Sequence, residues 1–174
     1  MPVMPDPGRQ ADAAKARDTA GVIAPPPLLA LGVVVFGLLL DHILPAYVLS
    51  LLLPMWLRVL GGVGLMACGC YLGFAAINGF RAAGTHVEPW KPTSALVGDG
   101  IYARLRNPMY AGLTLVLGGL AILLASDWML VLTILFVPVM HFGVVLREER
   151  YLAARFGEPY RRYLATVPRY GWPL

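Results

Sequence analysis

Residues 108–146 read PMYAGLTLVLGGLAILLASDWMLVLTILFVPVMHFGVVL and contain a single charged residue, Asp127. Ser126 and Asp127 separate two apolar runs, at about Pro108–Ala125 and Trp128–Leu146. At about 1.5 Å per helical residue, each run is nearly long enough to cross roughly 30 Å of hydrocarbon. Because so few residues join the runs, we predict a tight antiparallel helical hairpin whose outer ends lie side by side.

Two further apolar runs, at about Leu28–Leu44 and Trp56–Phe80, raise the expected number of spans to four. The shorter run Tyr47–Leu53 is bounded by prolines and predicts either a re-entrant or interfacial piece or an extension of a neighbouring helix. Of the 174 residues, 58% are hydrophobic and 14% are charged, whereas about a quarter are charged in soluble domains. The sequence therefore predicts an all-α integral membrane bundle of about four transmembrane helices.

The basic residues predict the orientation of this bundle. All of the 14 Lys and Arg residues except Arg58 fall in the N-terminal tail, in the loop after the second span or in the C-terminal segment. Cytoplasmic loops are enriched in Lys and Arg, so we expect both termini and the middle loop to be cytoplasmic. Because these charges form loop clusters and not one basic face, the net charge of +4 does not predict a nucleic-acid partner.

Outside the spans, two terminal segments have their own composition. Residues 1–27 mix acids, bases, Ala and Pro without the order of a signal peptide, which predicts a flexible cytoplasmic tail before a membrane domain at residues 28–174. In residues 147–165, apolar side chains recur every three or four positions with arginines between them. This pattern predicts a C-terminal amphipathic helix at the membrane surface, bent near Gly157.

The second span carries residues whose expected role is packing. A Gly69-x-x-x-Gly73 pair is typical of helices whose backbones approach closely in lipid. Cys68 and Cys70 point away from each other on a helix, and no Cys/His set has zinc-ligand spacing. We therefore expect no disulfide and no metal site, and we interpret both cysteines as small packing residues.

Polar side chains gather at the cytoplasmic ends of the third and fourth expected spans. Because these spans form a hairpin, the two groups should be neighbours and enclose a polar pocket at the membrane surface. His141 and Glu148, seven residues apart, should share one helical face. The residues expected to meet are Arg106, Asn107 and Tyr110 from the third span, and His141, Glu148 and Glu149 from the fourth.

The start of the third span has the features of an anion site. Asn107-Pro108 is a typical helix start, because asparagine favours the N-cap and proline the first helical position. The free N–H groups and positive dipole end there attract anions, and the Arg106 guanidinium adds a carboxylate-matching fork. The ordinary alternatives are a simple cap and, above all for Arg104, a topology charge.

The remaining residues of the corner suit other parts of a ligand. Glu148 and Glu149 offer acceptors for an ammonium or for sugar hydroxyls, whereas Tyr102 and Tyr110 offer aromatic faces. Together with the anion site, they suit a zwitterionic ligand that bears a nucleoside. The alternatives are that the acids only balance nearby arginines and that His141 is a satisfied buried histidine.

Two motifs in this half of the chain resemble a known family. They are Leu96-Val97-x-x-Gly100-x-Tyr102-x-x-x-Arg106-Asn107-Pro108-Met109-Tyr110-x-Gly112 and Glu148-Glu149-x-x-Leu152-x-x-x-Phe156-Gly157-x-x-Tyr160-x-x-Tyr163. Residues 85–170 thereby resemble the membrane methyltransferases that include isoprenylcysteine carboxyl methyltransferases and phospholipid N-methyltransferases. The lead-in Thr85-x-Val87-x-Pro89-x-x-Pro92 is similar to bacterial members, which implies a bacterial inner membrane.

The resemblance implies S-adenosyl-L-methionine as methyl donor and a lipid or other amphiphilic acceptor. The sequence also departs from its relatives: the eukaryotic isoprenylcysteine enzymes have histidines in place of Ser94 and Asn107 and an arginine in place of Val144. The phospholipid-methylating type has an acid in place of Arg106. By motif, the residues at donor-contacting positions are Leu96, Val97, Tyr102, Arg106, Asn107, Pro108, Met109, Tyr110 and Glu148.

For catalysis, we expect Arg106 to hold the donor carboxylate and either His141 or Glu149 to remove a proton from an amine or thiol acceptor. A carboxylate acceptor needs no base. Two other functions stay open: an NADPH-dependent membrane reductase of related helical layout, and a non-enzymatic membrane scaffold. Binding of the methyl donor, of NADPH or of neither distinguishes the three.

Overall fold

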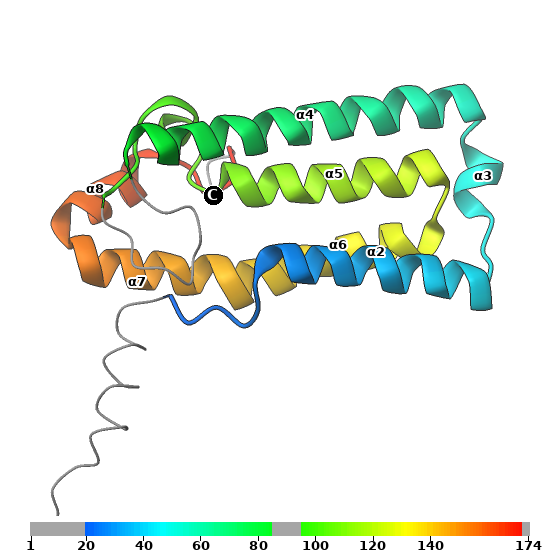
Figure 1. The fold of residues 1–174 in the computed structure, drawn as a ribbon, viewed down its shortest axis with the longest axis horizontal. Coiled ribbons are helices and arrows are strands. Elements are labelled where there is room, and N and C mark those ends of the chain that lie inside the picture. The colour runs from blue at the N-terminus through cyan, green and yellow to red at the C-terminus, as the bar shows by residue number, and fades with distance from the viewer. Residues whose placement is uncertain (1–19, 85–94, 172–174) are drawn as a thin grey trace, which may run out of the picture.

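The computed structural model describes residues 20–84 and 95–171, and these residues form helices and connecting loops without a strand. The N-terminal tail up to residue 19 and the lead-in at residues 85–94 lie outside them. Most helices run along the long axis, with α3 at one end and α8 at the other (Figure 1). In order, they are α2 (Pro26–Ile43), α3 (Val48–Leu52), α4 (Met55–Ala82), η1 (Gly100–Ala103), α5 (Pro108–Leu124), α6 (Asp127–Met140), η2 (His141–Val145), α7 (Leu146–Phe156) and α8 (Glu158–Thr166).

Helices α4 and α5 approach each other through paired glycines. A Cβ added to Gly69 would lie 2.5 Å from the Gly112 carbonyl oxygen, and one added to Gly62 would lie 2.8 Å from that of Gly119. The close approach predicted for the second span is therefore present, but the glycines that form it are Gly62 and Gly69, not Gly69 and Gly73. A Cβ on Gly73 would meet no atom within 4 Å. Side chains at the paired positions would force the two backbones apart.

The expected hairpin of the third and fourth spans is confirmed. Helix α5 ends at Leu124, Ala125 turns the chain with a φ of 53°, and α6 starts at Asp127. The Ser126 hydroxyl caps α6 by accepting a hydrogen bond from the Met129 amide at 3.2 Å. Helix α2 packs against the same hairpin, since a Cβ on Gly37 would lie 2.8 Å from the Met129 Cα.

Two aspartates fasten the end of the bundle that holds α3. Asp41 accepts hydrogen bonds from the Ser126 hydroxyl and from the Trp128 amide, the latter at 3.3 Å. Asp127 accepts from the amides of Val48 and Leu49, at 3.0 and 2.9 Å. The short run between the prolines is thus a capped helix that joins α2 to α4, and Asp41 has partners that the sequence did not identify.

Helix α6 passes into α7 through the π-helical segment η2. Pro138, which lacks an N–H, stands in α6 one turn before this segment. A π turn inserts an extra residue into the helical repeat, so residues on its two sides no longer follow α-helical spacing. The expectation that His141 and Glu148 share a face was therefore wrong: His141 bonds to Tyr170 and Glu148 to Tyr110.

The outer surface is apolar, as expected for helices in lipid. Helices α2, α4 and the continuous stretch Asp127–Phe156 are long and apolar enough to cross a membrane, and the 17-residue α5 is apolar but shorter. Large hydrophobic side chains such as Phe36 and Phe74 are exposed on them. Cys68 and Cys70 are free and exposed. The interpretation of the cysteines as packing residues was therefore wrong within this chain, because α4 turns Gly62 and Gly69 toward α5 and leaves both cysteines exposed.

Candidate active site

A cavity lies between the start of α5, the segment before it and the α7–α8 pair. Its non-atom space amounts to about 820 Å³, a figure that includes open solvent at its mouth. It is lined by Ala20, Phe80, Ala95, Leu96, Val97, Tyr102, Arg106, Asn107, Pro108, Met109, Tyr110, Glu148, Glu149, Tyr151, Leu152, Tyr160 and Tyr163.

Tyr110 and Glu148 join α5 to α7 inside this cavity. The Tyr110 hydroxyl donates a hydrogen bond to Glu148 Oε1 at 2.6 Å. A hydrogen bond of this length holds the carboxyl group of Glu148 next to the Tyr110 ring. The expected meeting of the third-span start with the acidic pair is therefore confirmed.

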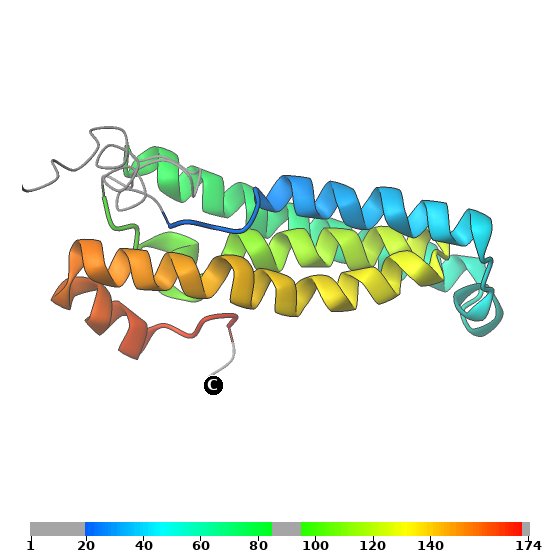
Figure 2. The same cartoon turned by 90° about the horizontal axis from the view of Figure 1, so that it is seen from below.

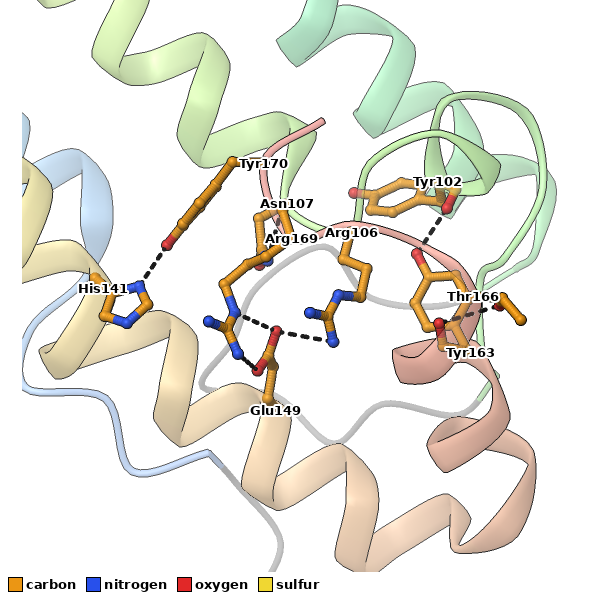
Figure 3. Close-up of polar contacts among 9 residues, drawn as sticks. All are labelled: Tyr102, Arg106, Asn107, His141, Glu149, Tyr163, Thr166, Arg169 and Tyr170. Carbon is orange, nitrogen blue, oxygen red and sulfur yellow. Dashed lines mark hydrogen bonds and ion pairs between the residues drawn. The ribbon is translucent and has the colours of Figure 1, made fainter. Parts of the chain in front are cut away.

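Glu149 forms the centre of a second polar cluster, with an arginine on either side (Figure 3). The Arg169 guanidinium contacts it in a bidentate manner, with Nε 3.0 Å from Oε1 and Nη2 2.8 Å from Oε2. Arg106 Nη1 lies 3.4 Å from Oε1. Glu149 is only 8% exposed. Both carboxylate oxygens of Glu149 are therefore already occupied by guanidinium groups of the chain.

At the start of α5, one buried guanidinium nitrogen has no partner among the described residues, and the helix lacks a side-chain cap. Asn107 is the N-cap residue, but its side chain makes no capping hydrogen bond. Within the described part of the chain, Arg106 Nε is buried and has no hydrogen-bond partner. Unpaired donors at a helix N-terminus, next to a buried guanidinium, form a site for an anion.

The segment after α8 holds the start of α5 in place. The Arg106 amide donates to the Pro168 carbonyl at 3.0 Å, and the Asn107 amide donates to the Arg169 carbonyl at 3.2 Å. The Asn107 side chain also donates to the Arg169 carbonyl, at 3.4 Å. The amphipathic pattern of this region gave no sign of these bonds, since backbone pairing leaves little trace in residue type.

Tyrosines close another side of the cavity. The Tyr163 hydroxyl of α8 donates to the Tyr102 carbonyl at 2.7 Å, and the Tyr102 ring packs edge-on against Phe80. Burial raises the pKa of Tyr163 to about 12 and also raises the pKa values of Tyr102 and Tyr160. All three phenols are therefore neutral near pH 7, so none adds a negative charge to the cavity.

The structure brings most of the sequence-predicted site residues together. All nine residues expected at donor-contacting positions line the cavity, as does Glu149. His141 does not line it: its Nδ1 lies 3.0 Å from the Tyr170 hydroxyl, on the other side of the Glu149 cluster (Figure 3). The sequence did not identify Ala20, Phe80, Ala95 or Tyr151 as lining residues, and of Leu152, Tyr160 and Tyr163 it indicated only their place in the second motif.

The described helices and this cavity define an all-helical protein with membrane-type apolar helices and, at one end of the bundle, a cavity lined by apolar, aromatic and charged side chains. The chain belongs to the phospholipid methyltransferase family, whose model matches residues 57–159. It is also similar to the protein-S-isoprenylcysteine O-methyltransferase of Schizosaccharomyces pombe, with 32% identity over 123 residues. That match covers 64% of this chain and 48%, about half, of the relative. A comparison with solved structures found no match.

Proposed function

We propose that this protein transfers a methyl group from S-adenosyl-L-methionine to an amphiphilic, membrane-associated acceptor. The observation that carries this proposal is the cavity, which collects all nine residues that the family motifs imply for donor binding. Family membership and the similarity to an isoprenylcysteine O-methyltransferase favour the same reaction class.

The cavity residues fit the donor's chemical groups. The uncapped start of α5 and the unpaired Arg106 Nε suit its carboxylate. Glu148, held by the Tyr110 hydroxyl, suits its ammonium or ribose hydroxyls, and the Tyr102 and Tyr110 rings provide faces for the adenosyl group. When bound, S-adenosyl-L-methionine supplies a methyl group on a sulfonium centre. The contribution of the protein is alignment in a site of restricted water access.

The acceptor enters the proposal only as a class: an isoprenylcysteine-type carboxylate, a phospholipid amine or a thiol. Neither expected base is well placed, because Glu149 is ion-paired with two arginines and His141 does not line the cavity. An amine or thiol acceptor needs a base to remove its proton. Glu148 is the candidate, because it lies in the cavity and has no arginine partner among the described residues. Val144, where the eukaryotic isoprenylcysteine enzymes have an arginine, is fully buried in the apolar core.

We further propose that four helices cross the bilayer and that the cavity faces the cytoplasm. The spans would be α2, α4, α5 and the α6–η2 stretch, with α7 and α8 at the membrane surface. Of the described arginines, all but Arg58 lie toward the cavity end, which is the cytoplasmic side by the positive-inside rule. An acceptor with a lipid tail would then reach the cavity sideways from the bilayer, and the donor would enter from water.

Calorimetric titration of the detergent-purified protein with S-adenosylhomocysteine tests the proposal. We expect saturable binding by the wild type and a loss of at least tenfold in affinity in Tyr110→Ala with Glu148→Ala, because both change the cavity wall. Asp127→Ala, at the opposite end of the bundle, is the matched control and should bind normally. Binding of NADPH but not of S-adenosylhomocysteine would favour a reductase, and binding of neither compound would favour a scaffold.

A further inference from the structure

The Glu149 cluster contains one residue that has no place in the family motifs. Arg169 lies after α8 and beyond the matched residues 57–159. It is not among the residues that line the cavity. Yet it makes the closest contacts to Glu149, at 2.8 and 3.0 Å, whereas Arg106 approaches the same carboxylate only to 3.4 Å.

The charges explain why the order of these distances matters. Glu149 is buried, and a buried carboxylate without a full partner is strongly destabilising. If Arg169 did not neutralise it, Arg106 would be the remaining guanidinium within reach. Arg106 would then pair tightly with Glu149 and would not offer its donors to a ligand. The bidentate geometry of Arg169 satisfies both carboxylate oxygens, and Arg106 Nε has no partner among residues 20–84 and 95–171.

The backbone around Arg169 fixes this arrangement. The carbonyls of Pro168 and Arg169 accept the amide hydrogens of Arg106 and Asn107, so the segment carrying Arg169 pairs directly with the residue it affects. Figure 3 shows the two guanidinium groups approaching Glu149 from opposite sides. These main-chain hydrogen bonds therefore fix the backbone at Arg169 next to the backbone at Arg106.

We propose that Arg169 is a positioning residue: by holding Glu149 in a bidentate ion pair, it keeps Arg106 available to the carboxylate of the methyl donor. This inference rests on the proposed function. It assigns to the C-terminal segment a role in ligand affinity, beyond that of a membrane-surface helix. Arg169 acts through Glu149 and Arg106 and does not touch the ligand itself.

The proposal predicts a rescue that a purely structural role would not produce. S-adenosylhomocysteine affinity, measured by calorimetry, should fall about tenfold in Arg169→Gln, because Arg106 then forms a tight ion pair with Glu149. The double variant Arg169→Gln with Glu149→Gln lacks the carboxylate that would pair with Arg106, so its affinity should recover to within about threefold of wild type. Arg162→Gln is the matched control, because its ion pair with Glu158 is exposed and does not involve Glu149.

Three outcomes would overturn the inference. Unchanged affinity in Arg169→Gln would show that Arg106 does not need this partner. A double variant weaker than Arg169→Gln alone would show that the cluster only supports folding. If Arg169→Gln does not fold, Arg169→Lys keeps the charge but loses the bidentate geometry, and wild-type affinity in that variant contradicts the proposal. Absence of binding by the wild type would instead refute the proposed function, and with it this inference.

Discussion

The two ends of the bundle use carboxylates in opposite ways. At the α3 end, Asp41 and Asp127 accept hydrogen bonds from a hydroxyl and from backbone amides, and so connect α2, α3 and α6. At the cavity end, Glu148 bonds to one tyrosine and Glu149 to two arginines, while the start of α5 stays uncapped. The carboxylates thus connect helices at the α3 end, whereas at the cavity end the start of α5 remains without a side-chain cap.

The difference depends on what surrounds the acids, not on the acids themselves. Asp41 and Asp127 meet helix starts directly, and their oxygens are used by amide donors of the chain. Near Glu149 the donors are guanidinium groups, and one of them, on Arg106, retains a buried Nε without a partner among the described residues. Arg58, in the first turn of α4, also has an unpaired Nε, but it does not line the cavity.

The largest expected effect is at the cavity end. Arg106→Gln should lower the affinity for S-adenosylhomocysteine about 10- to 100-fold, because a hydrogen bond to a charged group contributes about 1.5–3 kcal/mol. The fold should persist, since Arg169 still neutralises Glu149. Calorimetry and thermal unfolding of the same preparation separate the two effects. Wild-type affinity in this variant would refute the assignment of Arg106 to the donor carboxylate.

At the opposite end, Asp41→Ala should change stability and leave affinity unaffected. Ser126 is 3% exposed, and the variant removes the acceptor of its hydroxyl and of the Trp128 amide. Leaving such groups unpaired costs about 1–3 kcal/mol. Unfolding in a denaturant titration in detergent should show this loss. A parallel fall in S-adenosylhomocysteine affinity would contradict the separation of the two ends.

A smaller effect is expected from Asp127→Ala. The variant removes the acceptor of the first amides of α3, at Val48 and Leu49, and loss of a helix cap costs about 1 kcal/mol. Hydrogen exchange should increase at these amides and remain unchanged at the start of α5. Protection equal to wild type at Val48 would show that α3 does not depend on this carboxylate.

The fold was largely predictable from the sequence because the apolar runs and the residues that end them are local signals. The start of α5 at Pro108 and the hairpin at Ser126 agree with the prediction. The π turn was not predictable, since Pro138 alone does not specify where the helical repeat changes. The consequence was specific: His141, expected in the pocket, bonds to Tyr170 instead.

The cavity residues on the motifs were predictable, but their partners were not. Arg169 and Pro168 contact the start of α5, which lies about 60 positions earlier in the sequence. The sequence contains several carboxylates, and nothing in it indicates which of them pairs with Arg169. The contact between Asp41 and the Ser126 hydroxyl was likewise not predictable, because a single aspartate in a sequence does not indicate which distant hydroxyl it accepts from. Long-range polar contacts follow from the packed helices and become visible only with them.

An effect as small as that of Asp127→Ala is expected at Tyr163, and this effect depends on pH. Tyr163→Phe removes the hydrogen bond to the Tyr102 carbonyl and should lower the free energy of unfolding by about 0.5–1.5 kcal/mol. Burial raises the pKa of this phenol to about 12, above its ordinary value near 10. The protonated donor therefore contributes stability below pH 10, and that contribution is lost as the pH rises through about 12. Denaturant titrations at pH 7 and pH 9 should give the same difference in free energy of unfolding between wild type and variant. A smaller difference at pH 9 would show that the phenol ionises at a lower pH, and that the cavity wall is more hydrated than its burial indicates.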